Sequence, residues 1–162
     1  MDDTRTGKGD PTIAELEEQE RKLVLPAADL GALHAIGARM YDTAVAEGLP
    51  LAIQVRAGER VVYAAAAPGS SAVNDEWAAR KARVVHLFER SSLLVRLTEV
   101  RDGISFEEKH RLPGDRFAAH GGAFPLRTRD SGFVGSVVVS GLPQLEDHAF
   151  VVRLLSEHVR AS

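Results

Sequence analysis

Two short hairpins separated by helical sequence constrain the fold of this chain more than any other feature. The segments Leu51–Arg56 and Arg60–Ala66 read as strands flanking the turn Ala57-Gly58-Glu59, and Ala123–Arg127 and Phe133–Ser140 form a second pair around a turn that contains glycine. Strands joined by tight turns run antiparallel, whereas parallel strands need long crossovers. We therefore expect an antiparallel sheet with helices packed on it, not a doubly wound parallel sheet.

Helical patterns fill the sequence around the hairpins. Asp10 as a cap and Pro11 at the first helical position predict the start of the first helix. A third helix follows Ser70-Ser71 or Asn74-Asp75, with Trp77, Lys81, Val84, Val85 and Phe88 on one face. Further helices are expected over Ala28–Glu47, Ser92–Glu99 and Leu145–Arg160, and Ser105 with Glu108 forms a capping box. On the last helix we expect Ala149, Val152, Leu155 and Val159 to face inward. The fold class is α/β of the α+β type.

Size and composition predict one domain and exclude several kinds of site. The chain has 162 residues, which we divide into a disordered tail over 1–9 and a domain over 10–162. Without cysteine there is no disulfide, thiolate nucleophile, iron–sulfur cluster or covalent c-type haem. A net charge of −3 gives no electrostatic footprint for nucleic acid. The longest apolar run, Val61–Ala67, is far short of the ~20 residues that a bilayer requires. With no signal peptide, we expect a cytoplasmic protein.

The usual enzyme motifs are absent from the sequence. It contains no phosphate-binding loop, no dinucleotide-binding turn, no nucleophile elbow and no close pair of metal-ligating histidines. We expect His34 to be partly buried on its helix, and we expect His86, His110 and His158 to be surface residues.

Two glycine-containing loops are better candidates for a site. In the first, His120 precedes Gly121 and Gly122, and the rigid apolar pair Phe124-Pro125 follows. Paired glycines permit a close approach of backbone to a ligand, and histidine can act as donor, acceptor or ligand near neutral pH. The alternative is a plain tight turn into an edge strand.

The second loop joins the last strand to the last helix. Gly141 begins it, and Asp147 and His148 lie in the first turn of the helix. Free backbone N–H groups at a helix N-terminus attract anions, but an acidic first turn is also typical of a simply capped helix. Because the two strands are hairpin partners, we expect His120 and His148 to fall in one cleft.

These segments resemble the GlcG/HbpS-like family of haem-degrading or haem-binding domains, in its branch of single-domain bacterial and fungal members. The matching stretches span most of the chain from about Leu51 onward. They are Asn74-Asp75-Glu76-Trp77 with Arg80-Lys81-Ala82-Arg83, Phe88-Glu89-Arg90-Ser91-Ser92, Ala118–Leu126, Val137–Gln144 and Glu146-Asp147-His148.

The resemblance implies a profilin-like fold, in which helices flank an antiparallel sheet, and a symmetric homo-oligomer. It also implies a cleft beside the Gly-Gly-x-x-Pro strand that takes haem, another tetrapyrrole or a small organic ligand. A haem site needs an axial ligand, an apolar slot and cations for the propionates. His120 or His148 would be the ligand, Phe124, Trp77 and Leu142 would form walls, and Arg80 and Arg83 would meet the carboxylates.

Three functions follow from these residues. The first is a non-catalytic ligand-binding protein that takes haem or another tetrapyrrole in the cleft beside the Gly-Gly-x-x-Pro strand, with His120 as the favoured axial ligand. The second is a homo-oligomeric module without cofactor that binds another protein. The third is a small-molecule enzyme that uses His120 with Asp147 or His148 as acid and base.

Overall fold

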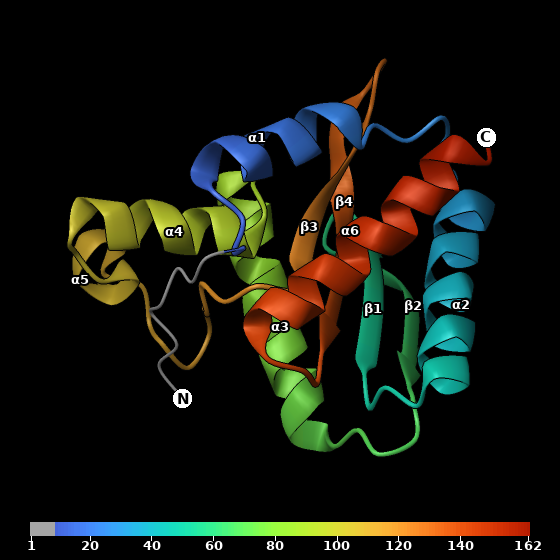
Figure 1. The fold of residues 1–162 in the computed structure, drawn as a ribbon, viewed down its shortest axis with the longest axis horizontal. Coiled ribbons are helices and arrows are strands. Elements are labelled where there is room, and N and C mark those ends of the chain that lie inside the picture. Colours follow the sequence, from blue (N-terminus) through green and yellow to red (C-terminus); the bar gives the residue numbers. More distant parts are fainter. Residues whose placement is uncertain (1–8) are drawn as a thin grey trace.

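The computed structural model describes residues 9–162, which form six helices and four strands (Figure 1). In chain order they are α1 (Ile13–Lys22), α2 (Leu30–Glu47), β1 (Ala52–Ala57), β2 (Arg60–Ala66), α3 (Ala72–Phe88), α4 (Ser92–Asp102), α5 (Phe106–His110), β3 (Ala123–Thr128), β4 (Gly132–Ser140) and α6 (Gln144–Arg160). Apart from Gly9, the tail predicted for 1–9 lies outside this range.

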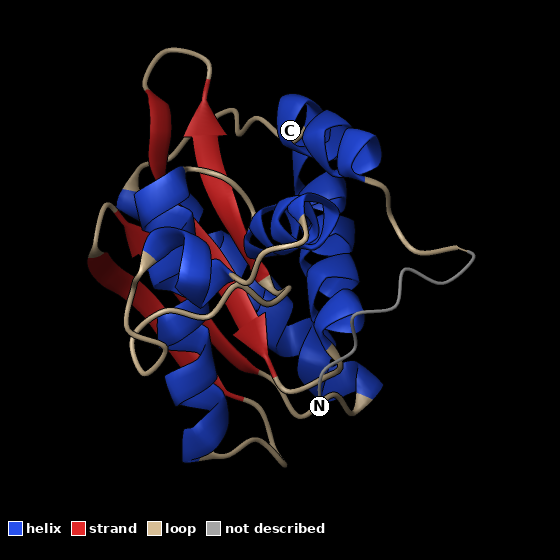
Figure 2. Ribbon diagram, turned by 90° about the vertical axis from the view of Figure 1, so that its left-hand side faces the viewer, coloured by secondary structure: helices blue, strands red, loops and turns tan. Residues whose placement is uncertain are grey.

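The four strands form one antiparallel sheet in the order β2-β1-β4-β3. The two hairpins meet through β1 and β4, so that Ala52 pairs with Ser140 and Ala57 pairs with Gly135. Helices lie on both sides of the sheet, with α2 and α6 on one face and α3 on the other (Figures 1 and 2). The expected profilin-like antiparallel sheet flanked by helices is confirmed.

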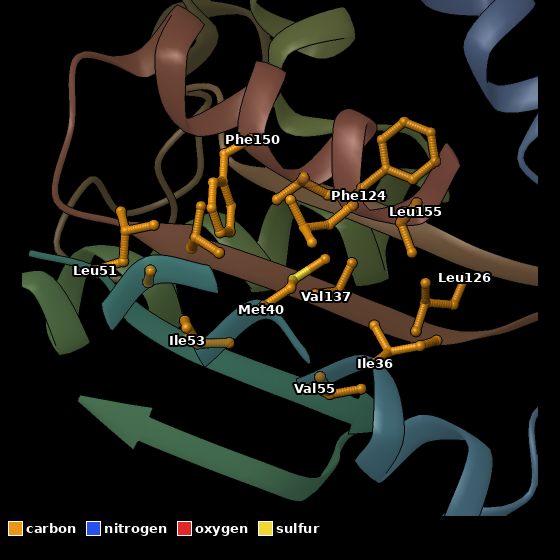
Figure 3. Close-up of a cluster of buried hydrophobic side chains, with 14 of the residues drawn as sticks. Ile36, Met40, Leu51, Ile53, Val55, Phe124, Leu126, Val137, Phe150 and Leu155 are labelled. Atoms are coloured by element: carbon orange, nitrogen blue, oxygen red, sulfur yellow. The ribbon is translucent and has the colours of Figure 1, made fainter. Parts of the chain in front are cut away.

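The main hydrophobic core lies between the sheet and the pair α2 and α6 (Figure 3). Met40 from α2, Phe150 from α6 and Phe124 from β3 meet there over the apolar faces of the strands. A smaller cluster under α3 packs Ala78, Ala82 and Val85 on the opposite face of the sheet. The period-two pattern of the strands thus divides their side chains between two cores.

Most helix boundaries lie close to the expected ones. Helix α2 begins at Asp29, whose side chain accepts from the Ala32 N–H, and ends at Gly48 in the left-handed conformation. The capping box at Ser105 and Glu108 is present and starts α5. The start of α1 differs from the prediction, because Thr12 rather than Asp10 is the cap and forms a capping box with Glu15.

Two further expectations need correction. On α6 Leu155 is buried, and Val152 and Val159 pack against the main core as expected, but Ala149 is exposed. The buried face also carries Phe150, Val151 and Leu154. It is wider than the predicted stripe because the helix contacts both the sheet and other helices, which a single periodicity does not show. The His34 side chain is exposed on α2 and meets the Tyr63 ring edge-on, with the ring centroids 5.3 Å apart.

The joint between the hairpins depends on Gly135. A Cβ atom at this position would overlap the carbonyl oxygen of Arg56 on β1, and it would lie 3.2 Å from the Cα of Ala57. Backbone atoms in the middle of a sheet cannot move aside cheaply. The close approach of β1 and β4 therefore requires a residue without a side chain.

Replacing this glycine tests the joint. We expect Gly135→Ala to lower the free energy of unfolding by about 1–3 kcal/mol, as overpacking does in other proteins. Urea denaturation followed by circular dichroism measures the change.

Gly114→Ala is the matched control, since a Cβ there meets nothing within 4 Å and the φ angle is not in the positive region. It should leave stability unchanged or raise it by about 0.4–1 kcal/mol. Equal effects of the two substitutions would contradict the packing argument.

Candidate functional site

A cavity of about 650 Å³ opens where the two glycine loops meet the N-terminal half of α3. One wall comes from α3, a second from the loop before β3, and a third from the segment that leads from β4 into α6. Its lining comprises Asp10, Asn74, Trp77, Lys81, His120, Gly121, Ser140, Gly141, Leu142, Pro143, Gln144, Leu145, Glu146 and Asp147. The cavity therefore brings together His120, Gly121, Gly141, Asp147 and Trp77 from the predicted site.

His120 is the histidine that lines this cavity. Its ring stands edge-on to the Trp77 ring, with centroids 5.1 Å apart and an angle of 81° between the planes. Within residues 9–162 neither ring nitrogen of His120 has a hydrogen-bond partner. By contrast, His86, His110 and His148 each bond to a neighbouring side chain. His120 is thus held by packing while its nitrogens stay available.

Burial lowers the pKa of His120 to about 4, and the positive charges of Arg96, Lys81 and Arg80 act in the same direction. At neutral pH the imidazole is therefore uncharged. Neutral imidazole is the form that coordinates metal ions, because the protonated ring has no free lone pair. The lining also includes the carboxylates of Asp10, Glu146 and Asp147, so the cavity as a whole is not positively charged.

A buried ion pair forms the floor of the cavity. The Lys81 ammonium donates to the Asp147 carboxylate at 3.1 Å, to the Gly121 carbonyl at 3.0 Å and to the Val139 carbonyl at 2.8 Å. Both charged residues are only 2% exposed. All three ammonium donors are satisfied, which is what a charge withdrawn from water requires.

Asp147 extends this network into the second loop. Its other carboxylate oxygen accepts from the Leu142 N–H at 3.0 Å, which holds the turn between β4 and α6. Burial raises the pKa of Asp147 and lowers the pKa of Lys81, while each charge opposes that shift in its partner. The pair therefore links α3, β4 and α6 through one cluster of hydrogen bonds.

Gly122 makes room for the ammonium group. Its φ angle of +132° is one that side chains rarely permit, and a Cβ there would lie 2.5 Å from both the Lys81 Nζ atom and the Val139 carbonyl oxygen. The second glycine of the pair thus accommodates Lys81 rather than the ligand. Gly121 N–H donates to the Gln144 side chain at 3.1 Å, which ties the first loop to the start of α6.

His148 lies beside the first loop, but its side chain does not line the cavity. It is 3% exposed, and its Nε2 atom lies 2.8 Å from the Gln19 side-chain oxygen on α1. Burial lowers the pKa of His148 to about 4. The expected shared cleft therefore contains His120 without His148, because the first turn of α6 directs His148 to the other side.

The remaining predicted residues surround the cavity at different distances. Phe124 is buried in the main core and Pro125 pairs with Ser136 inside the sheet. The Arg80 guanidinium lies over the Trp77 ring, 4.4 Å from its centroid, and donates to the Gly114 carbonyl at 2.6 Å. Arg83 points to a separate pocket, where it donates to the Arg116 carbonyl.

Lys81 is the residue that sequence reasoning placed on the apolar face of α3 without a role. Its position four residues after Trp77 and three before Val84 was the signal, since a lysine inside an apolar stripe needs a buried acceptor. Nothing local in the sequence identifies Asp147 as that acceptor.

The arrangement gives little support for an acid–base pair. Both oxygens of Asp147 are engaged, and His148 faces α1. In the part of the chain that the structure describes, no three His, Asp or Glu side chains gather as metal ligands. Among the same residues, no helix has the length and hydropathy to cross a bilayer.

Comparison with known proteins identifies similar chains and folds. The model of a family described as "Haem degrading protein HbpS-like" matches residues 29–156. A UPF0303 protein of Streptomyces avermitilis is 47% identical over 147 residues, which cover 91% of this chain and 90% of the relative. A UPF0303 protein of Streptomyces coelicolor is 44% identical over 92% of this chain and 94% of its own.

Solved structures share the fold at lower identity. The crystal structure of the Ybr137w protein has a TM-score of 0.86 at 24% identity, covering 94% of this chain and 90% of that one. The crystal structure of the PduOC:heme complex has a TM-score of 0.68 at 18% identity, covering 80% of this chain and 94% of that one. The crystal structure of HbpS has a TM-score of 0.64 at 15% identity, covering 94% of this chain and 96% of that one.

Removing one partner of the buried ion pair tests its role. We expect Lys81→Met to lower the free energy of unfolding by about 3–5 kcal/mol, because Asp147 is left buried without a countercharge. Urea denaturation measures the loss. Adding Asp147→Asn to Lys81→Met should recover part of it, since the uncompensated charge is then removed.

Lys22→Met is the matched control for this substitution. Its side chain is 72% exposed and its ion pair with Glu18 is on the surface, so the loss should stay below about 1 kcal/mol. If Lys81→Met lowered the free energy of unfolding as little as Lys22→Met does, the buried pair would not hold the site together.

The buried His148 also predicts a pH dependence of stability. Its pKa is about 4 in the folded protein and about 6.5 when unfolded, so only the unfolded chain takes up the proton between these values. The free energy of unfolding should therefore fall as the pH drops from about 6.5 to 4, by up to about 1.4 kcal/mol per pH unit from this group.

His148→Gln removes that titration and should make the decline shallower in urea titrations across this range. His34→Gln, at an exposed position, should leave the slope unchanged. Parallel curves for the wild-type protein and His148→Gln would refute the assignment.

Proposed function

Because this chain belongs to the family of HbpS-like haem-degrading proteins, we propose that it binds haem or a related tetrapyrrole in the cavity at His120. The observation that carries the proposal is the neutral imidazole of His120, held against Trp77 with both nitrogens free of partners among the described residues. A histidine nitrogen is the axial ligand in many haem proteins.

The cavity has the size and the chemistry for such a ligand. Its volume of about 650 Å³ falls within the range of about 300–1,000 Å³ that is typical of small-molecule and cofactor sites. Trp77, Leu142 and Leu145 supply apolar surface for a flat macrocycle.

The residues of this chain would bind and orient the group. His120 would be the axial ligand, and Trp77, whose ring the Arg80 guanidinium covers, would line one edge. When bound, the iron would supply redox chemistry, while the protein supplies the pocket and its electrostatics. A similar fold in a structure titled as a haem complex supports this proposal.

The proposal includes a homo-oligomer. Among the described residues the outer edge of β2 pairs with no other strand, and Val61 on this strand is 46% exposed. An open strand edge with an exposed apolar side chain is a surface that a second copy can cover. A cofactor-free interaction module remains the second candidate, and the same surface favours it.

Haemin titration of the purified protein tests the function. We expect a Soret shift that saturates at one haem per chain. His120→Ala should weaken haemin binding roughly tenfold or more, because the axial ligand is lost. In His120→Gly, added imidazole should restore the spectrum by occupying the space of the missing ring.

His34→Ala is the matched control, since His34 is exposed and does not line the cavity. It should leave the titration unchanged. A wild-type protein without a Soret shift, or a shift that His120→Ala leaves intact, would reject haem binding at this site and leave the interaction module as the better candidate.

A further inference from the structure

A second cavity lies on the same side of the sheet as α3, beyond the two glycine loops. It has a volume of about 350 Å³ and is formed by β1, the turn after it, the C-terminal half of α3 and the loop before β3. Its lining comprises Arg56, Glu59, Arg83, His86, Leu87, Arg116 and Phe117. None of these residues lines the cavity at His120.

The charges in this second cavity are unbalanced. Three arginines, Arg56, Arg83 and Arg116, face one carboxylate, that of Glu59. Across residues 9–162, no acidic side chain lies within ion-pair distance of any of the three guanidinium groups. Neighbouring guanidinium charges repel one another. The pKa of Arg56 is lowered mainly by burial, and the positive charge of Arg83 lowers it further. A bound anion would offset this repulsion.

Neutral partners hold two of the three guanidinium groups in place. Arg56 donates from Nη2 to the Gln54 side chain at 3.1 Å, and Arg83 donates from Nη1 to the Arg116 carbonyl at 3.1 Å. The Nε atom of Arg56 is buried and has no hydrogen-bond partner among residues 9–162. Buried donors are nearly always satisfied, so an unpartnered guanidinium N–H beside a cavity indicates a missing acceptor.

His86 adds a neutral polar group to the wall. Its Nε2 atom lies 2.8 Å from the Ser136 hydroxyl, and Ser136 is the partner of Arg56 across the β1–β4 pair. Burial and the charge of Arg56 lower the pKa of His86, whereas Glu59 opposes them, and the net shift favours the neutral ring. The cavity therefore carries the charge of three cations and one anion.

We propose that this cavity binds a small phosphorylated compound, with the phosphate between Arg56, Arg83 and Arg116. The fork of N–H groups on guanidinium matches the geometry of phosphate oxygens, and a dianion balances the excess charge better than a single carboxylate does. Leu87 and Phe117 form an apolar side of the cavity, against which the organic part of the compound packs. The volume exceeds that of a phosphate alone.

Isothermal titration calorimetry with phenyl phosphate, inorganic phosphate and benzoate tests this site. We expect saturable binding of one phenyl phosphate per chain, weaker binding of inorganic phosphate and the weakest binding of benzoate. Arg56→Gln and Arg116→Gln should each reduce the affinity for phenyl phosphate at least roughly tenfold.

Arg129→Gln is the matched control, because Arg129 is an exposed arginine in the β3–β4 turn and its loss changes the net charge equally. It should leave binding unchanged. Arg116 is exposed, so its variant decides the question if Arg56→Gln fails to fold by circular dichroism.

Two results would overturn the site: no saturable binding of phenyl phosphate to the wild-type protein, or equal losses in Arg116→Gln and Arg129→Gln. Haemin titration of Arg116→Gln should match the wild-type protein, because the two cavities share no lining residue. The experiments therefore test the phosphate site and the haem site independently.

Discussion

The buried ammonium of Lys81 is the contact on which the candidate site depends. One side chain from α3 meets the loop before β3, the end of β4 and the first turn of α6. A buried lysine is unfavourable by itself, and here its charge is offset by one carboxylate and two carbonyl groups. The desolvation of both charges makes the pair sensitive to any loss of a partner, so it specifies a single arrangement of the two loops.

The position of His120 follows from this arrangement. The Lys81 ammonium leaves no room for a side chain at position 122, which must therefore be glycine. The same ammonium donates to the carbonyl of Gly121, the residue that follows His120. Trp77, one turn earlier on α3, then supports the imidazole ring. The same helix continues to Arg83 and His86, so α3 forms a wall of both the proposed haem site and the proposed phosphate site.

Local sequence patterns predicted the sheet and the glycine loops, whereas side-chain partners required the structure. Hairpin strands and their turns are local, so the antiparallel pairing within each hairpin followed from period and turn residues alone. The adjacency of the two loops followed from hairpin topology. The direction of His148, the burial of Lys81 and the separation of Arg83 from Arg80 depend on contacts between residues far apart in sequence. A three-residue spacing on a helix places two arginines on neighbouring positions but does not reveal that each meets a different cavity.

A crystal structure of the protein with haemin, with diffraction recorded at the iron absorption edge, is the most direct test of the site. We expect the iron peak within coordination distance of a His120 ring nitrogen, with the macrocycle beside Trp77 and with Lys81 still hydrogen-bonded to Asp147. An iron peak at another histidine, or a His120 cavity without iron in haemin-saturated crystals, would contradict the assignment.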